Sequence, residues 1–154
     1  MTRRRRLMVL AVVGSVATVL SLAWAASYHM RNFRTVEQGV LYRSGQLTPT
    51  GLKYALRRHG IKTVVTLRTV RDPGKPYLDE WEEQVCAAHG VRHVRIVPRP
   101  WTVDEKGELP AKQVVGEFLA VMDDPTNHPV LVHCFAGVHR TGTLCGIYRM
   151  EYQG

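Results

Sequence analysis

Apolar and polar positions divide the chain into one long apolar run and a following region of short, alternating segments. Leu7 to Ala26 form twenty residues without a charged side chain, and only three hydroxyl side chains interrupt them. At about 1.5 Å per helical residue, this length matches the hydrocarbon core of a bilayer, which is about 30 Å thick. The pattern predicts a transmembrane helix within residues 1–26, followed by a polar connector over 27–38.

Charges on both sides of the apolar run predict its orientation. Arg3 to Arg6 precede it, so the positive-inside rule puts the N-terminus in the cytoplasm and the remainder outside. Arg31, Arg34 and Arg43 on the other side weaken this bias. A signal peptide cleaved after Ala23-Trp24-Ala25, giving a secreted protein, is the alternative, and a buried helix is the third interpretation. The run exceeds the roughly 7–15 apolar residues of a signal peptide, which favours a single-pass anchor.

After residue 39, short β-branched runs alternate with segments of helical periodicity. Strands are expected over 40–44, 63–67, 91–97 and 130–133. Helices are expected from Pro49, with Thr48 as N-cap, to Gly60, over 78–88, from Pro110 onward and over 143–150; loops are expected over 72–76 and 98–108. This alternation predicts an α/β fold with a central, mostly parallel sheet of about four to five strands flanked by helices.

Composition narrows the classes of partner. The formal net charge is +8, but four of the 21 basic residues are Arg3 to Arg6, and the other 17 stand against 13 acidic residues. This small, scattered excess argues against nucleic-acid binding and suits a site that handles anions. Three cysteines without metal-ligand spacing argue against a disulfide framework, a metal site and a metal cofactor.

The segment from His133 to Gly142 carries the most chemical information. Cys134 and Arg140 stand six positions apart and bracket a loop that contains Gly137. A strand is expected before the loop and a helix after it, and this geometry points successive backbone N–H groups at one anion. A cysteine at the head of such a loop can be a nucleophilic thiolate. The segment therefore predicts phosphoryl transfer through a phosphocysteine.

The pattern His-Cys-x5-Arg-Thr-Gly resembles that of the cysteine-based protein tyrosine phosphatase superfamily. Together with Tyr42-Arg43-Ser44-Gly45-Gln46 and the strand at Thr63–Arg68, it is similar to the atypical dual-specificity group with plant, fungal and bacterial members. The resemblance spans roughly Phe33 to the C-terminus and implies a phosphatase domain over 39–154. Relatives usually continue further, so a C-terminally truncated domain is one interpretation. The implied substrates are phosphotyrosine-type proteins or small phosphorylated molecules.

The resemblance implies a role for each loop residue. Cys134 is the expected nucleophile, and the planar fork of Arg140 is expected to bind two phosphoryl oxygens. Thr141 is expected to donate its hydroxyl to the sulfur, and the ring of His133 to hydrogen-bond the loop. Substrate binding is expected from Arg140, from the neighbouring strand end at Arg68, and from the loop residues Phe135, Ala136, Gly137, Val138 and His139.

A general acid is expected on a loop about 30 residues before the cysteine, as in the family. Asp104 stands 30 positions before Cys134 and follows Trp101, although Trp-Thr-Val-Asp departs from the family's Trp-Pro-Asp. Glu105, Asp72 and the lack of any dedicated acid are the alternatives. Protonation of the leaving oxygen matters least for good leaving groups such as aryl phosphates and pyrophosphates.

Alternative functions and interpretations stay open at this point. They are a pseudophosphatase that captures phosphorylated ligands without turnover, an inositol (pyro)phosphate phosphatase and, more weakly, an arsenate reductase. Phe135 makes the loop rim apolar, and Val138 stands where some relatives carry lysine. Cys86 and Cys145 are interpreted as buried thiols or as partners in a reversible disulfide with Cys134. Trp81 is expected in the core, His93 on the surface or at a helix end, and Glu80, Glu82 and Glu83 on a solvated helix face.

Overall fold

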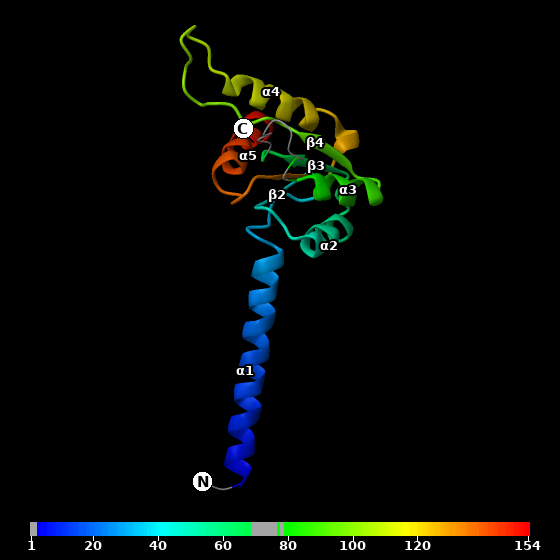
Figure 1. Ribbon diagram of the computed structural model, residues 1–154, viewed down its shortest axis with the longest axis vertical. Coiled ribbons are helices and arrows are strands. Elements are labelled where there is room, and N and C mark those ends of the chain that lie inside the picture. The colour runs from blue at the N-terminus through cyan, green and yellow to red at the C-terminus, as the bar shows by residue number, and fades with distance from the viewer. Residues whose placement is uncertain (1–2, 69–76, 78) are drawn as a thin grey trace.

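The computed structural model describes residues 3–68, 77 and 79–154, and shows a long helix that projects from a sheet-containing domain (Figure 1). The helices are α1 (Arg3–His29), α2 (Pro49–His59), α3 (Glu80–Ala88), α4 (Ala111–Met122) and α5 (His139–Tyr152), with a short 3-10 turn at Pro125–Asn127. The strands are β1 (Arg34–Glu37), β2 (Leu41–Ser44), β3 (Thr63–Thr66), β4 (Arg92–Arg95) and β5 (Val130–His133).

The five strands form one mixed sheet in the order β1-β2-β5-β3-β4. β2, β5, β3 and β4 run parallel, and β1 pairs antiparallel with β2 at the edge. The mostly parallel sheet predicted from the alternating pattern is therefore confirmed. In the register of this sheet, Ser44, His133 and Thr66 lie side by side at the ends of their strands. The carboxyl edge of the sheet is thus where β5 delivers the cysteine loop.

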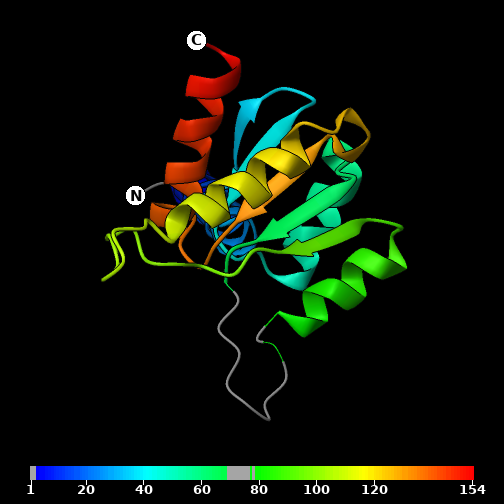
Figure 2. The ribbon, with the colours of Figure 1, turned by 90° about the horizontal axis from the view of Figure 1, so that it is seen from above.

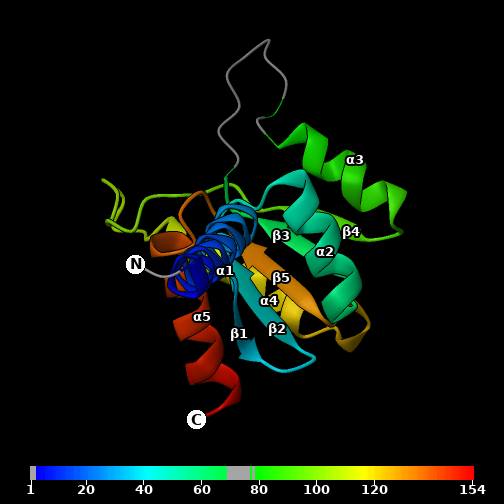
Figure 3. The same ribbon diagram turned by 90° about the horizontal axis from the view of Figure 1, so that it is seen from below.

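Helices cover both faces of the sheet. On one face, Leu52 of α2 and Cys86 of α3 pack against Val64 and Leu131 of the strands. On the other face, α4 and α5 (yellow and red in Figure 2) pack against the sheet around the fully buried Phe118. Figure 3, seen from the side toward which α1 projects, shows α2 in front of the strands and α3 beside the β4 edge of the sheet. The fold is therefore a three-layer arrangement, with the sheet as its middle layer.

Local sequence signals explain the limits of α2. The Thr48 side chain accepts a hydrogen bond from the N–H of Gly51 at 3.2 Å, and Pro49 occupies the first helical position. Gly60 ends the helix in the left-handed conformation, with φ +61°, which a glycine adopts without steric cost. These are the cap residues that the sequence predicted.

The segment predicted as a polar connector differs from that prediction. α1 continues to His29, and Arg34–Glu37 form strand β1, so most of residues 27–38 belong to regular elements. The ring of Phe33 stacks on those of Tyr42 and His59, with ring centroids 5.8 and 4.9 Å apart, and this packing ties the segment to the domain.

Two further boundaries differ from the sequence pattern. β4 spans Arg92–Arg95 only, whereas β-branched residues predicted a strand over 91–97. α5 already begins at His139, so its first turn includes Arg140 and Thr141. The predicted loop over 72–76 lies outside the described residues.

α1 stands apart from the core. It is long and apolar enough to cross a membrane by length and composition, and the rest of the described chain does not bury its apolar window. Large apolar side chains along it, such as Leu10, Val13 and Leu20, are exposed. A helix that is apolar all round is ordinarily buried in a protein core or in a bilayer.

Candidate active site

The cysteine loop turns from β5 into α5 at the carboxyl edge of the sheet, and three successive carbonyls tie it in place. The carbonyl of Phe135 accepts from the N–H of Gln46 at 3.0 Å, and that of Ala136 from Asn32 Nδ2 at 2.8 Å. The carbonyl of the next residue, Gly137, accepts from the Arg43 guanidinium. Because these carbonyls bond to groups outside the loop, the N–H groups of the loop can face an anion or the Cys134 thiolate on its inner side.

Two glycines allow the loop to lie directly on the end of β2. Gly137 has φ +73°, and a Cβ built on it would lie 2.3 Å from the nitrogen of Gly45. A Cβ on Gly45 would in turn lie 2.9 Å from the carbonyl oxygen of Ala136. Backbone packs on backbone here, so neither position has room for a side chain.

Cys134 is buried, yet its surroundings favour the thiolate. Burial alone would raise the pKa of this thiol, but the hydroxyl of Thr141 and the N–H groups of Thr141, Gly137 and Val138 outweigh burial and lower it. The N–H of Gly137 lies 3.2 Å from the sulfur. The Thr141 oxygen has no other hydrogen-bond partner among the described residues, so its hydroxyl is available to the thiolate. These surroundings therefore favour the thiolate, which is the nucleophilic form of a cysteine.

Arg140 lies at the opposite end of the loop from the cysteine. Its guanidinium donates to the carbonyl of Leu67, at the end of β3, over 3.0 Å. It also borders a cavity of about 380 Å³, which Pro98, Trp101 and Val114 help to line. The guanidinium is thus oriented by backbone and keeps other donors available for an anion.

The candidate general acids lie on the exposed loop before α4. Asp104 Oδ1 accepts from the N–H groups of Lys106 and Glu108, each at 2.9 Å, and so closes a turn of its own loop. Neither Asp104 nor Glu105 is among the residues that line the cavity beside Arg140, whereas Trp101 is. The third candidate, Asp72, lies outside the described residues.

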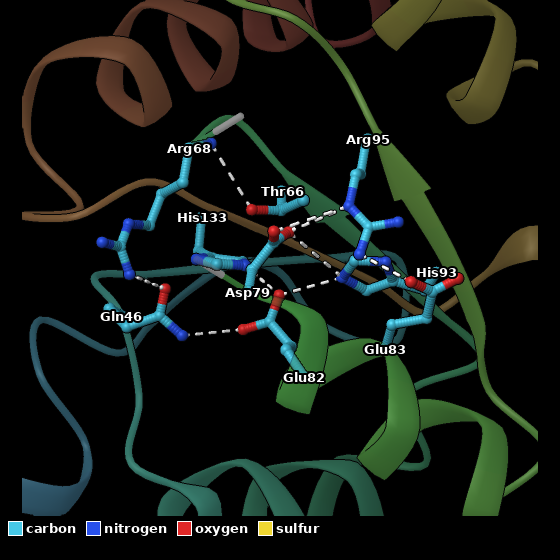
Figure 4. Close-up of polar contacts among 9 residues, drawn as sticks. All are labelled: Gln46, Thr66, Arg68, Asp79, Glu82, Glu83, His93, Arg95 and His133. Atoms are coloured by element: carbon cyan, nitrogen blue, oxygen red, sulfur yellow. Dashed lines mark hydrogen bonds and ion pairs between the residues drawn. The ribbon is translucent and has the colours of Figure 1, made fainter. Parts of the chain in front are cut away.

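Behind the loop, His133 bonds to a buried carboxylate instead of to the loop (Figure 4). Its Nε2 lies 2.7 Å from Oε1 of Glu82, and the Nε2 of His93 lies 3.0 Å from the same oxygen. Glu82 is only 1% exposed, so the solvated face expected over Glu80, Glu82 and Glu83 is wrong at its central residue. The surface position expected for His93 is wrong too, because its side chain faces this carboxylate.

The ionisation of Glu82 follows from these contacts. Burial would raise the pKa of its carboxyl, but the charge and hydrogen bond of His133 and the hydrogen bonds from His93 and Gln46 lower the pKa to about 2. An ionised carboxylate only accepts hydrogen bonds, so each ring must present Nε2–H to it. Glu82 therefore fixes the orientation of the His133 ring, directly before Cys134 in the chain.

The same carboxylate is linked to the rim of the loop through Gln46. Gln46 Nε2 donates to Glu82 Oε2 at 2.8 Å, and its Oε1 accepts from Arg68 at 2.8 Å. The Arg68 guanidinium lies 5.2 Å from the ring centroid of Phe135, and that of Arg31 lies 4.5 Å from it. Two cations therefore flank the exposed aromatic residue of the loop.

Glu82 also belongs to the one group of side chains among the described residues that a metal could bridge. Ligand atoms of Asp79, Glu82 and His93 lie within 4.8 Å of one another. Arg95 Nε lies 3.3 Å from Asp79 Oδ2, and its other arm bonds Glu83. Because the Arg95 guanidinium already pairs with Asp79, and the rings of His93 and His133 already contact Glu82, the geometry fits a network of side-chain contacts better than a metal centre.

Sequence reasoning missed four residues that hold the site: Asn32, Arg43, Gln46 and Glu82. Glu82 left a readable signal, because it precedes Val85 and Cys86 by three and four positions and so shares their buried helix face. Asn32 left none, since its partner Ala136 is 104 positions away. The other two loop contacts likewise depend on how β2 lies against the loop.

Comparison with known proteins agrees with this geometry. The family model described as "DSP-PTPase phosphatase fused to NAD+ Kinase" matches residues 14–153. Inositol diphosphatase DSP4 of Arabidopsis thaliana is 54% identical over 122 residues, which cover 77% of this chain and 54% of the relative. The putative tyrosine-protein phosphatase OCA1 of Yarrowia lipolytica is 32% identical over 118 residues, covering 77% and 43%. The chain thus spans about half the length of these curated relatives.

Solved structures share the fold. The Siw14 catalytic core superposes with a TM-score of 0.63 at 22% identity, covering 81% of this chain and 69% of that one. Pseudomonas aeruginosa TpbA, in a complex with phosphotyrosine, superposes with a TM-score of 0.59 at 25% identity, covering 80% and 65%.

Proposed function

Because the chain belongs to the family of dual-specificity-type protein tyrosine phosphatases, we propose that it hydrolyses phosphomonoesters through a phosphocysteine. The observation that carries this proposal is the buried Cys134, whose pKa is lowered by the Thr141 hydroxyl and the loop N–H groups despite its burial. A stabilised thiolate in a loop with outward-tied carbonyls suits attack on a phosphate dianion.

The proposed reaction has two steps. The Cys134 thiolate attacks phosphorus, the P–O bond to the leaving group breaks, and Asp104 supplies the proton that this oxygen takes up. Water then attacks the phosphorus of the phosphocysteine and gives a proton to the Asp104 carboxylate. The S–P bond breaks, which releases inorganic phosphate and restores the Cys134 thiolate. Arg140 binds two phosphoryl oxygens in both steps, and the Leu67 carbonyl orients it.

The substrate is proposed to be a phosphotyrosine-type protein or a small phosphorylated molecule. The exposed ring of Phe135 supports an aromatic phosphoester. Arg31 and Arg68 beside that ring support a second candidate, an inositol (pyro)phosphate, because they place positive charge next to the loop. A relative that is 54% identical carries the name inositol diphosphatase, which also supports the second candidate.

Turnover of an aryl phosphate by the full chain tests the chemistry. We expect hydrolysis that vanadate blocks, a phosphoenzyme that can be trapped by acid quenching, and loss of both in Cys134→Ser. Hydrolysis by Cys134→Ser at the parent rate would refute the mechanism. Saturable phosphate-ligand binding without turnover by the wild type would instead identify a pseudophosphatase. Relative kcat/KM on a phosphotyrosine peptide and on inositol polyphosphates then decides between the substrate candidates.

We also propose that α1 anchors the domain in a membrane, with the N-terminus cytoplasmic and the domain outside. The length and apolar exposure of α1 support the anchor, and Arg3 to Arg6 support the orientation. Labelling of an added C-terminal cysteine by an impermeant reagent on intact cells tests the orientation, and protection from labelling would reverse it. A mature protein that begins after Ala25 would instead show that a signal peptide is removed.

A further inference from the structure

We propose that the outward face of α2 lies on the headgroup layer of an anionic bilayer and holds the domain against the membrane surface. This inference rests on the proposed anchoring by α1. The face consists of the exposed residues Thr50, Lys53, Tyr54, Arg57 and Arg58.

The end of α1 is fixed to the beginning of α2. His29 Nδ1 lies 2.6 Å from the hydroxyl oxygen of Thr48, the N-cap of α2. A Cβ on Gly51 would lie 2.0 Å from the carbonyl oxygen of His29, so the two helices meet backbone to backbone. The position of α2 relative to α1 is therefore set by close packing, and a membrane around α1 fixes the height of α2 above it.

That height corresponds to the headgroup layer. His29 lies three residues beyond the apolar run that ends at Ala26, which is about 4.5 Å along a helix axis. The polar layer on each side of a bilayer is about 5–7 Å thick. Trp24 and Tyr28, exposed and stacked with their ring centroids 5.5 Å apart, occupy the end of the apolar run, where aromatic residues mark the membrane interface. The first turn of α2 thus lies level with lipid headgroups.

The exposed face of α2 points toward that layer. Leu52, Ala55 and Leu56 are buried against the sheet, so the opposite side of the helix faces away from it. Seen from the side toward which α1 projects, α2 lies in front of the strands (Figure 3). The two observations together turn Lys53 and Tyr54 toward the surface from which α1 would emerge.

The chemistry of this face fits anionic lipid. Lys53, Arg57 and Arg58 supply three cations, and no ion pair found among the described residues involves them. Tyr54 is 56% exposed and offers an apolar ring with a polar tip, as interfacial aromatic residues do. Each basic residue near an anionic surface favours binding by about 1 kcal/mol, or roughly fivefold. Continuity with α1 distinguishes a bilayer from a soluble anionic partner.

The depth of position 54 in vesicles tests the proposal. The full chain carrying Cys134→Ser and Tyr54→Cys is labelled with a polarity-sensitive fluorophore and reconstituted in phosphatidylcholine, with or without phosphatidylglycerol. A probe at Met150→Cys is the matched control, because Met150 is 72% exposed on α5, which covers the other face of the sheet. We expect the emission of the fluorophore to shift to the blue and to be quenched by headgroup-labelled lipid at position 54 only. Both effects should be stronger in vesicles that contain phosphatidylglycerol.

Charge variants test whether the basic side chains of α2 hold this helix on anionic lipid. Changing Lys53, Arg57 and Arg58 together to Gln should reduce the lipid-contacting population by roughly fivefold per charge, or about a hundredfold in all. The same change at Lys106, Lys112 and Arg149 removes equal charge elsewhere and should leave the signal unchanged. A probe at position 54 that stays in water while the protein floats with vesicles would overturn this inference alone. Release of the protein from vesicles at about 1 M salt, where the Debye length is about 3 Å, would overturn the anchor and this inference with it.

Discussion

Three thiols in this chain show how local surroundings decide cysteine chemistry. Burial raises the pKa of Cys86 to about 12 and that of Cys145 to about 11, so both remain protonated, as expected for structural residues. Cys134 is also buried, but the Thr141 hydroxyl and the loop N–H groups face its sulfur, and its pKa falls. The hydrogen-bond donors, and not solvent exposure, distinguish Cys134 from the other two thiols.

Thr141→Val should raise the pKa of Cys134. Removing one hydroxyl that stabilises the thiolate costs about 1 kcal/mol, which corresponds to somewhat less than one pKa unit. The pH midpoint of iodoacetamide alkylation should move upward, and the acid limb of kcat/KM should move with it. Thr143→Val is the control, because the Thr143 hydroxyl bonds the His139 carbonyl. An unchanged midpoint in Thr141→Val would exclude the hydroxyl from thiolate stabilisation.

Glu82 should make the protein sensitive to acid. The pKa of its carboxyl is lowered to about 2 from an ordinary value of 4.5, so its ionised form stabilises the fold above pH 4.5, and this contribution disappears as the pH falls toward 2. In detergent solution, the melting temperature of Glu82→Gln should therefore depend less on pH between 4.5 and 2 than that of the wild type. Glu82→Ala, which strands two buried imidazoles, should cost about 3 kcal/mol or more.

The neighbouring Glu83 provides the control for Glu82→Gln. It lies on the same helix and pairs with Arg95, but its side chain is largely exposed. Glu83→Gln should change stability and its pH dependence little. Equal effects of the two glutamine variants would mean that the buried carboxylate has no special role.

At the residue scale, the sequence predicted the groups that stand close together in the chain. Cys134, Thr141 and Arg140 occupy one short segment, so their spacing alone indicated an anion loop. The prediction of a solvated Glu82 is wrong because its partner His133 stands 51 positions away in the sequence. Three neighbouring acidic residues, taken alone, indicate a solvated helix face. Burial of a charge becomes visible only when the partner that neutralises it is in place.

The loop between β5 and α5 depends on backbone contacts that leave no space. Gly137→Ala should displace the loop, because a Cβ would lie 2.3 Å from the Gly45 nitrogen at a φ of +73°. We expect loss of most activity. Gly146→Ala in α5 is the matched control: no atom lies within 4 Å of its Cβ position, and stability should rise by about 0.5–1 kcal/mol. Normal kinetics in Gly137→Ala would contradict the close packing.

The loop before α4 contains the proposed acid, and leaving-group dependence tests it. Asp104→Asn should lower kcat on alkyl phosphates by about 10²–10⁴-fold and leave aryl phosphates much less affected, since good leaving groups need little protonation. Glu105→Gln should change neither rate. Equal rates of wild type and Asp104→Asn on both substrates would exclude Asp104, whose carboxylate in this structure caps the turn at Lys106 and Glu108.

At the element scale, hydrophobic periodicity predicted types better than ends. α2 has both of its expected caps because Thr48, Pro49 and Gly60 act locally. The sequence does not predict β1, because apolar and polar residues do not alternate clearly over Arg34–Glu37. This strand is defined by its pairing with β2. The strand predicted over 91–97 is shorter in the structure. It spans Arg92–Arg95, the residues that pair with β3. Elements defined by tertiary pairing cannot be delimited from their own residues.

At the scale of the whole molecule, a domain of the phosphatase family and an exposed apolar helix form one chain. If α1 lies in a bilayer, a charge at its centre should be costly, by about 3 kcal/mol. Val13→Asp should therefore reduce retention on vesicles by on the order of a hundredfold in flotation assays. Ser27→Asp, at the polar end of α1, should be tolerated. Equal flotation of wild type and Val13→Asp would argue against a membrane-spanning α1.

The strand order has a consequence for how the protein is made. Among the described strands, β5 comes last in the sequence, yet it lies in the middle of the sheet, between β2 and β3. Until Val130–His133 have left the ribosome, β2 and β3 lack their shared neighbour, and both keep an unpaired edge. The nascent domain therefore keeps these strand edges open to wrong partners until β5 is available, and it completes its sheet only as Cys134, the next residue, is added.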